Sequence, residues 1–164
     1  MARRTDDENG DGIGQCWLAK SEPSVYSIDD LRRDGSTLWD GIRNYQARNF
    51  LRSMQVNDRV LFHHSSGDPT GVVGTAVVVG LAQPDPTQFD PRSEGFDEAS
   101  KREDPRWCAV TVRFGSRLAV PVTMAMLRAD RSLKGMRILQ RGNRLSVMPV
   151  TAAEFARVLK LGGS

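Results

Sequence analysis

Eleven consecutive residues, from Trp39 to Asn49, carry an unusual density of groups that could bind a flat, polar ligand. The segment WDGIRNYQARN combines an indole, a phenol, two guanidinium groups and three side-chain amides around a glycine turn. Asn44 is a suitable helix N-cap, because its short amide can accept a hydrogen bond from a backbone N–H of the first turn. An apolar stripe with helical spacing then runs from Ala47 to Met54. An aromatic ring beside the positive end of a helix suits a planar, partly anionic ligand.

Three other stretches place polar side chains at the ends of expected strands. Residues 20–22 close a first strand, residues 63–65 close another, and residues 140–146 precede the last one. Polar groups gathered around aromatic walls are typical of sites that recognise a single flat heterocycle. The sequence therefore predicts a binding site built from strand ends and from the start of one helix.

The three tryptophans are expected to differ in role. Trp39 is expected in the loop that leads into the helix, between a Thr-Leu pair and an Asp-Gly turn, which favours a place in the site. Trp107 is expected in the core, and the sequence favours neither place for Trp17.

A catalytic interpretation rests on His63, His64, Ser65 and Glu22. The two histidines are adjacent, and adjacent side chains of a strand point to opposite faces, so at most one of them can face a given pocket. No spacing of Cys and His resembles a metal site, and no nucleotide-binding or nucleophile-elbow motif occurs. A hydrolase or base-modifying enzyme is therefore the alternative to a binding protein, with no metal and no cofactor expected.

Basic residues concentrate between positions 128 and 144. This run holds six basic residues against a single acid, Asp130, and the whole chain has 19 Arg against 4 Lys. A solvated surface and a phosphate-binding patch are both compatible with such a run, but its one-sided charge favours the second. The expected phosphate-contacting residues are Arg128, Arg131, Lys134, Arg137 and Arg141.

The elements that must position these groups form one α+β domain. Short apolar and β-branched runs predict about five or six strands flanked by short helices, without regular βαβ alternation. Three glycines within the strand expected at residues 70–81 indicate bulges, so a curved mixed sheet or open β-barrel fits best. Residues 107–114 and 118–122 are expected to form a hairpin around Gly115 and Ser116.

The expected domain spans residues 15–161. Residues 1–14 contain three Gly, four acids and two Arg, which predicts a disordered N-terminal tail. Residues 83–106 are rich in Pro and acids and are expected to form a functional or packed loop. A hydrophobic content of 39% and a charged content of 26% are ordinary for a globular protein, and no run approaches the roughly 18–20 apolar residues that cross a membrane. Two cysteines without a secretion signal predict reduced thiols and a cytoplasmic location.

Five motifs in a fixed order resemble the EVE domain, a member of the PUA-like superfamily. They are WLAKSEP at 17–23, WDGIRNYQARN at 39–49, FHHS at 62–65, DPTQFD at 85–90 and RLSVMPV at 144–150. The resemblance implies a PUA-like curved mixed β-barrel and a pocket for a modified cytosine or adenine flipped out of DNA or RNA. Two places depart from the family pattern, namely the His63–His64 pair and the Gly95-Phe96-Asp97 step.

Transferred residue by residue, the resemblance assigns a base-binding pocket to four segments of the chain. The implied pocket residues are Trp17, Lys20, Ser21, Glu22, Trp39, Arg43, Asn44, His63, His64, Ser65, Arg144 and Ser146. The leading hypothesis is a non-enzymatic reader of a modified base in nucleic acid, with no membrane partner. A protein-interaction module that keeps the fold but has no ligand pocket is a third possibility.

Overall fold

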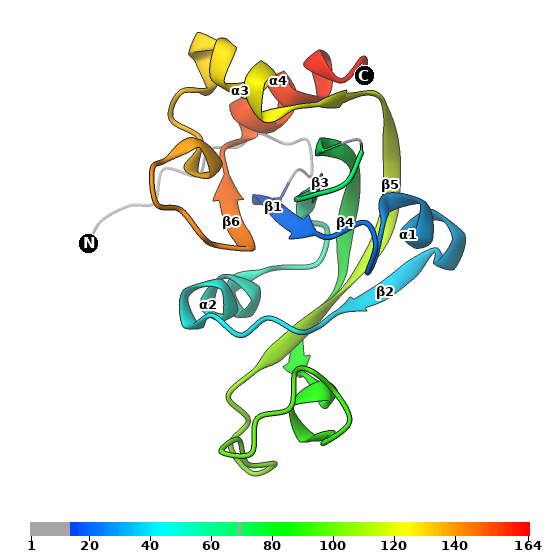
Figure 1. Ribbon diagram of the computed structural model, residues 1–164, viewed down its shortest axis with the longest axis vertical. Helices are drawn as coiled ribbons and strands as arrows, with labels where there is room; N and C mark the ends of the chain where they lie inside the picture. Colours follow the sequence, from blue (N-terminus) through cyan, green and yellow to red (C-terminus); the bar gives the residue numbers. More distant parts are fainter. Residues whose placement is uncertain (1–13, 69) are drawn as a thin grey trace, which may run out of the picture.

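Within the part of the chain that the structure describes, one six-stranded mixed sheet, in the order β2-β5-β4-β3-β1-β6, forms the centre of the molecule (Figure 1). The structure is a computed structural model that describes residues 14–68 and 70–164. The strands are β1 (Cys16–Ser21), β2 (Ser36–Trp39), β3 (Arg59–His64), β4 (Gly71–Pro84), β5 (Cys108–Val122) and β6 (Val147–Val150). Strands β1 and β3 are parallel, and the other neighbouring pairs are antiparallel. The predicted α+β class with six strands in a curved mixed sheet is confirmed, whereas the expected tail lies, except for Gly14, outside the described residues.

In the described residues, four α-helices and three short 3₁₀ helices surround the sheet. They are α1 (Ile28–Asp34), α2 (Tyr45–Ser53), α3 (Met124–Ala129), α4 (Ala152–Leu161), η1 (Pro86–Phe89), η2 (Arg131–Leu133) and η3 (Arg137–Leu139). The Asn44 side chain accepts a hydrogen bond from the Ala47 N–H, which confirms it as the N-cap of α2. In the described part of the chain, no helix is long and apolar enough to cross a membrane.

The sheet has a hydrophobic core on each face, because side chains alternate along every strand. On β1, Trp17 and Ala19 join the core that α1 and α2 cover, whereas Cys16 and Leu18 join the core that α3 and α4 cover. The central strands therefore contribute side chains to both cores, and the ends of these strands can contribute side chains to a site.

The long strands β4 and β5 give the sheet its curvature. Their pairing shifts register between Val72 and Gly74 and again between Val78 and Gly80, which confirms the bulges predicted from the glycines. A Cβ at Gly74 would lie only 2.5 Å from the Ser116 carbonyl oxygen, so the close approach of the two strands requires glycine there.

Two expectations about strands were wrong. Residues 107–122 do not form a hairpin, because Ser116 pairs with Thr75 of β4 and the chain continues as the single bent strand β5. Trp39 was expected in a loop but is the last residue of β2, where it pairs with Val110. Strand β2 is only four residues long and has no alternating apolar pattern, so its pairing with β5 decides its structure.

The acidic segment at residues 83–106 is packed rather than loose. The Gln88 side chain is fully buried, and its Nε2 donates hydrogen bonds to the Asp85 and Trp107 carbonyl oxygens at 2.7 and 2.8 Å. Its Oε1 accepts from the Ser100 hydroxyl at 2.6 Å. These bonds close the segment against the start of β5.

Candidate functional site

A cavity of about 490 Å³ opens where β1 and β2 end. Its volume lies within the roughly 300–1,000 Å³ typical of small-molecule sites. The residues that line it are Lys20, Ser21, Val25, Tyr26, Thr37, Leu38, Trp39, Asp40, Gly41, Ile42 and Ser146. Four residues predicted for the pocket therefore come together here: Lys20, Ser21, Trp39 and Ser146.

Trp39 supplies the large aromatic surface of this cavity. Its ring meets Phe62 edge-on, with the centroids 5.4 Å apart and the planes at 85°. It is only partly buried, and it packs against the core that α1 and α2 cover. Because one edge of the indole is held by packing, the remaining surface has a fixed orientation toward the cavity.

The opposite wall comes from the end of β1 and the residue before β6. The Lys20 N–H donates to the Ser146 carbonyl oxygen at 2.8 Å, and the Ser21 hydroxyl donates to the Tyr26 carbonyl oxygen at 2.5 Å. Burial lowers the pKa of Lys20 below its ordinary value. The lysine therefore brings a partly desolvated donor to the wall.

Arg43 is tied to the acidic segment and does not line the cavity. Its guanidinium makes five hydrogen bonds, to the Ile42 carbonyl, twice to the Gly95 carbonyl, to the Thr87 hydroxyl and to Asp85. The Asp85 carboxylate is fully buried and lies 2.9 Å from Arg43 Nη1. These hydrogen bonds hold the loop that follows Trp39 in place. Arg43 therefore supports the cavity wall without lining the cavity.

Asp85 also holds the cavity wall directly. Its Oδ2 accepts a hydrogen bond from the Gly41 N–H at 2.8 Å, and Gly41 itself lines the cavity with a φ of 78°. Burial alone would raise the pKa of Asp85, but hydrogen bonds from Thr87, Arg43 and Gly41 outweigh it and hold that pKa below its ordinary value. An ionised carboxylate therefore anchors this turn.

The structure places Trp17 and Glu22 away from the cavity lining. Trp17 is buried, its indole N–H donates to Asp58 Oδ2 at 2.9 Å, and its ring packs 5.8 Å from Phe50. Glu22 is exposed beyond the end of β1. Trp107, expected in the core, is buried there and donates its indole N–H to Asp97 at 2.8 Å.

The two histidines are both buried, and the hydrogen bond described for the Ser65 side chain goes to a backbone carbonyl. His64 Nε2 accepts the Ile28 backbone N–H at 3.1 Å, while the Ser65 hydroxyl interacts with the Ser21 carbonyl oxygen at 3.4 Å. Neither ring nitrogen of His63 has a hydrogen-bond partner in the described structure. Burial first, and then the charges of Lys20 and His64, lower the pKa of His63 to about 4.

A second hollow of about 370 Å³, beside the start of α2, brings together four more of the predicted residues: Asn44, Arg137, Arg141 and Arg144. It is lined by Asn44, Gln46, Arg137, Gln140, Arg141, Gly142, Asn143, Arg144 and Leu145. Three guanidinium groups and several amides thus share one concave surface. Arg144 lies in this hollow, whereas Ser146, two residues later, lines the cavity with Trp39.

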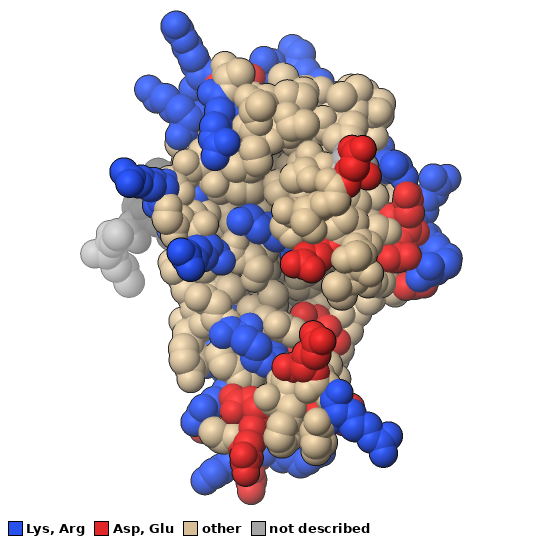
Figure 2. Space-filling view, viewed as in Figure 1, with Lys and Arg blue, Asp and Glu red and all other residues tan. Residues whose placement is uncertain are grey.

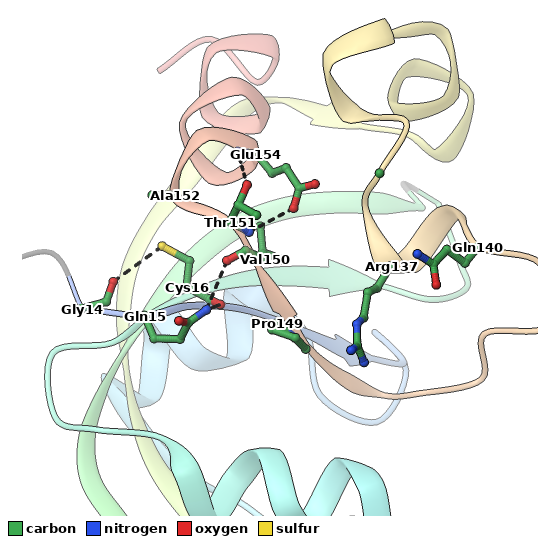
Figure 3. Close-up of a pocket in the computed structure, with 11 residues that line it drawn as sticks. Gly14, Gln15, Cys16, Arg137, Gln140, Pro149, Val150, Thr151, Ala152 and Glu154 are labelled. Atoms are coloured by element: carbon green, nitrogen blue, oxygen red, sulfur yellow. Dashed lines mark hydrogen bonds between the residues drawn. The ribbon is translucent and has the colours of Figure 1, made fainter. Parts of the chain in front are cut away.

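A third hollow, of about 430 Å³, continues this surface (Figure 3). Arg137 and Gln140 line it as well, opposite Gln15 and Cys16, so the two hollows share a wall. The Arg137 guanidinium lies 5.4 Å from the centre of the Phe50 ring. We call the two hollows together the basic groove. Arg128, Arg131 and Lys134 are exposed but do not line it.

Basic and acidic side chains are unevenly distributed over the surface of the molecule. In Figure 2, the Lys and Arg side chains at mid-height on the left of the view, over the region of β6, stand without acidic neighbours, whereas the basic side chains lower in the view lie beside acidic ones. On the right, over α1, basic and acidic side chains are mixed. The basic groove is therefore the side of this face best suited to an anionic chain.

Sequence reasoning missed several residues of the cavity. Val25, Tyr26, Thr37 and Leu38 enter because the β1–α1 loop and β2 meet, which no local pattern indicated. Asp40 belongs to the segment singled out above, and the signal for it was its place next to Trp39. Burial and the charge of Asp85 raise the pKa of Asp40 above its ordinary value.

Comparisons with known proteins agree with this geometry. The EVE domain family matches residues 15–161. Thymocyte nuclear protein 1 of Homo sapiens is 37% identical over 168 residues, covering 91% of this chain and 74% of the relative. A solved Pseudomonas syringae protein is 43% identical, with a TM-score of 0.87 over 90% of this chain and 99% of its own. The human THYN1 protein in complex with DNA containing 5-methylcytosine is 36% identical, with a TM-score of 0.85 over 92% of this chain and 99% of that one. This chain belongs to the EVE domain family.

Proposed function

We propose that this protein binds a modified base in DNA and does not act on it chemically. The observation that carries the proposal is the cavity beside Trp39, which combines an aromatic wall with polar groups from three segments of the chain. A homologue covering nearly the whole domain binds 5-methylcytosine-containing DNA, which supports the same ligand class here. RNA remains the alternative carrier of the base.

In this proposal the modified base leaves its strand and enters the cavity. A base inside a stack exposes neither face, so a site that reads it against an indole requires an unstacked or flipped nucleotide. The flanking phosphates would then lie on the basic groove, which adjoins the cavity through residues 144–146. Phosphate contacts supply affinity and position, and the cavity supplies the preference for the base.

The test is direct binding to labelled strands that differ at one base. Oligonucleotides with a central 5-methylcytosine or cytosine, as single-stranded DNA, duplex DNA and RNA, should be titrated at several salt concentrations, because the phosphate contribution depends on salt. We expect tighter binding to the methylated DNA. Equal affinity for methylated and unmodified strands in every format would overturn the proposal.

Replacing Arg137 and Arg141 together with Ala should weaken binding to modified and unmodified strands alike. Both residues line the basic groove, and each lost phosphate contact should flatten the logarithmic salt dependence by about one unit or slightly less. The matched control is the Arg128→Ala, Arg131→Ala pair, which removes the same charge outside the groove. An identical loss of slope in both double variants would show that only net charge matters.

Replacing Trp39 with Ala should remove a stacking contact worth about 1–3 kcal/mol, or roughly 5- to 150-fold in affinity. The loss should fall on the modified strand and spare non-specific binding, because stacking acts on the flipped base. Trp107→Ala is the control, since it removes a buried indole that does not line the cavity. Melting temperature and affinity should be measured on both variants; if folded Trp39→Ala keeps the full base preference, the cavity is not the site.

A further inference from the structure

Tyr45 is an exposed aromatic residue that neither the cavity nor the basic groove uses. It is the first residue of α2, and it is 54% exposed. Its neighbours in the chain, Asn44 and Gln46, both line the second hollow, which belongs to the basic groove. Tyr45 itself lines none of the three hollows described above. Its ring therefore stands at the border of a surface to which we assign phosphate contacts.

One face of the Tyr45 ring rests on an indole that is firmly held. The Trp107 ring lies 4.9 Å from it, centroid to centroid, with the two planes at 27°. Trp107 is 6% exposed, its indole N–H donates to Asp97 at 2.8 Å, and its backbone N–H donates to the buried Gln88 side chain at 3.1 Å. Because its support is fixed, the Tyr45 ring has its orientation before any ligand binds.

The other face of the Tyr45 ring is open. The Arg48 guanidinium carbon lies 4.7 Å from the centre of the Tyr45 ring and 6.0 Å from the centre of the Trp107 ring. A cation centred on the face away from Trp107 would lie much farther from the indole. Arg48 therefore lies toward the edge of the Tyr45 ring and leaves the centre of the outer face uncovered, in agreement with the exposure of Tyr45.

Arg48 adds a positive charge beside this open face. Within residues 14–68 and 70–164 it forms no salt bridge, and its guanidinium donates only to the Arg106 carbonyl oxygen and to the Asn49 side chain. Asp97, the partner of the Trp107 indole, lies 3.8 Å from the Arg106 guanidinium, which offsets its charge. An open aromatic face with a cation at its edge suits a nucleotide, because the base can stack and the phosphate is anionic.

We infer that Tyr45 is a second stacking platform, which takes an unpaired base of the same DNA strand whose modified base enters the cavity. This inference rests on the proposed function, because the cavity and the basic groove hold that strand in place. Every base has a π-face, so the platform adds affinity without reading sequence. Bases inside a duplex already stack on their neighbours and are not available to it. The DNA that fits best is therefore a strand whose modified base has unpaired neighbours.

Single-stranded DNA probes that lack one base test the platform. Each probe carries a central 5-methylcytosine, and an abasic nucleotide replaces one neighbour at a time, up to about three positions away on either side. We expect one of these abasic positions to weaken wild-type binding about fivefold or more. Tyr45→Ala should weaken binding to the intact strand by a similar factor, and the same abasic position should then cost nothing further.

Two variants and one further probe serve as controls. Tyr45→Phe keeps the ring and should bind as the wild-type protein does. Phe96→Ala removes another exposed aromatic ring, which lines none of the three hollows, and it should leave binding unchanged. A duplex probe with the same 5-methylcytosine should lose less than about twofold in Tyr45→Ala, because its other bases remain stacked on one another. The melting temperature of each variant shows that the compared proteins are folded.

The outcomes for the platform and for the proposed function are distinct. The platform is overturned if Tyr45→Ala binds the intact single strand as well as Phe96→Ala does. It is also overturned if Tyr45→Ala loses affinity but still shows the full wild-type cost at every abasic position. Equal wild-type affinity for 5-methylcytosine and cytosine would instead defeat the proposed function. In that case the comparison of Tyr45→Ala with Tyr45→Phe on the unmodified single strand still decides whether Tyr45 stacks on bases.

Discussion

Replacing Asp85 with Ala should cost about 3–5 kcal/mol of folding free energy, as when one partner of a buried ion pair is removed. The carboxylate is fully buried and accepts hydrogen bonds from Gly41, Arg43 and Thr87. Its loss would leave the Arg43 guanidinium, which is only about a quarter exposed, without its counter-charge. Urea unfolding of the wild-type and variant proteins measures the difference.

Two companion variants make this result specific. Asp90→Ala removes an exposed carboxylate from the same segment, and it should cost less than about 1 kcal/mol. Asp85→Asn keeps acceptor capacity without the charge, and it should fall between the two. A loss in Asp85→Ala no larger than that in Asp90→Ala would contradict the role of Asp85 as the anchor of the cavity wall.

Lowering the pH from neutral to about 4 should destabilise the wild-type protein by about 3 kcal/mol through His63 alone. Its pKa is about 4 in the folded protein, against about 6.5 in an unfolded chain. Between these values the unfolded state binds the extra proton, so stability is complete above about pH 6.5 and is lost as the pH falls toward 4. The cause is the cost of charging an imidazole that is 3% exposed.

His63→Leu should remove this contribution. Neither ring nitrogen of His63 makes a hydrogen bond in the described structure, so an apolar side chain of similar size should be tolerated at neutral pH. Carboxylates elsewhere also contribute to acid unfolding, so the informative quantity is the difference between the two pH profiles. Parallel profiles for the wild-type protein and the variant would show that His63 does not titrate in this range.

Local sequence was sufficient where local hydrogen bonds decide the structure. Asn44 caps α2, because its side-chain oxygen and the Ala47 N–H that donates to it lie three residues apart. The glycines of β4 likewise predicted bulges. These features depend on residues that are close together in the sequence.

The site was less predictable because distant partners decide where each side chain goes. Trp17 and Trp39 both belong to family motifs, but Trp17 meets Asp58, 41 residues away, and is drawn into the core. Arg43 belongs to the same motif as Trp39, yet Asp85, 42 residues later, turns its guanidinium away from the cavity. The hairpin expected at Gly115 failed for a similar reason, since β4 is long enough to pair along the whole of β5.

The cavity is lined by residues at the two opposite edges of the sheet. Trp39 belongs to β2, Ser146 directly precedes β6, and these are the first and last strands in the sheet order. The distance between the two walls therefore depends on the twist accumulated across β5, β4, β3 and β1, as well as on the side chains that line the cavity. Relatives with identical lining residues but a displaced bulge in β4 can accept ligands of different size. Alignment of the lining residues alone is thus insufficient to transfer a ligand between members of the family.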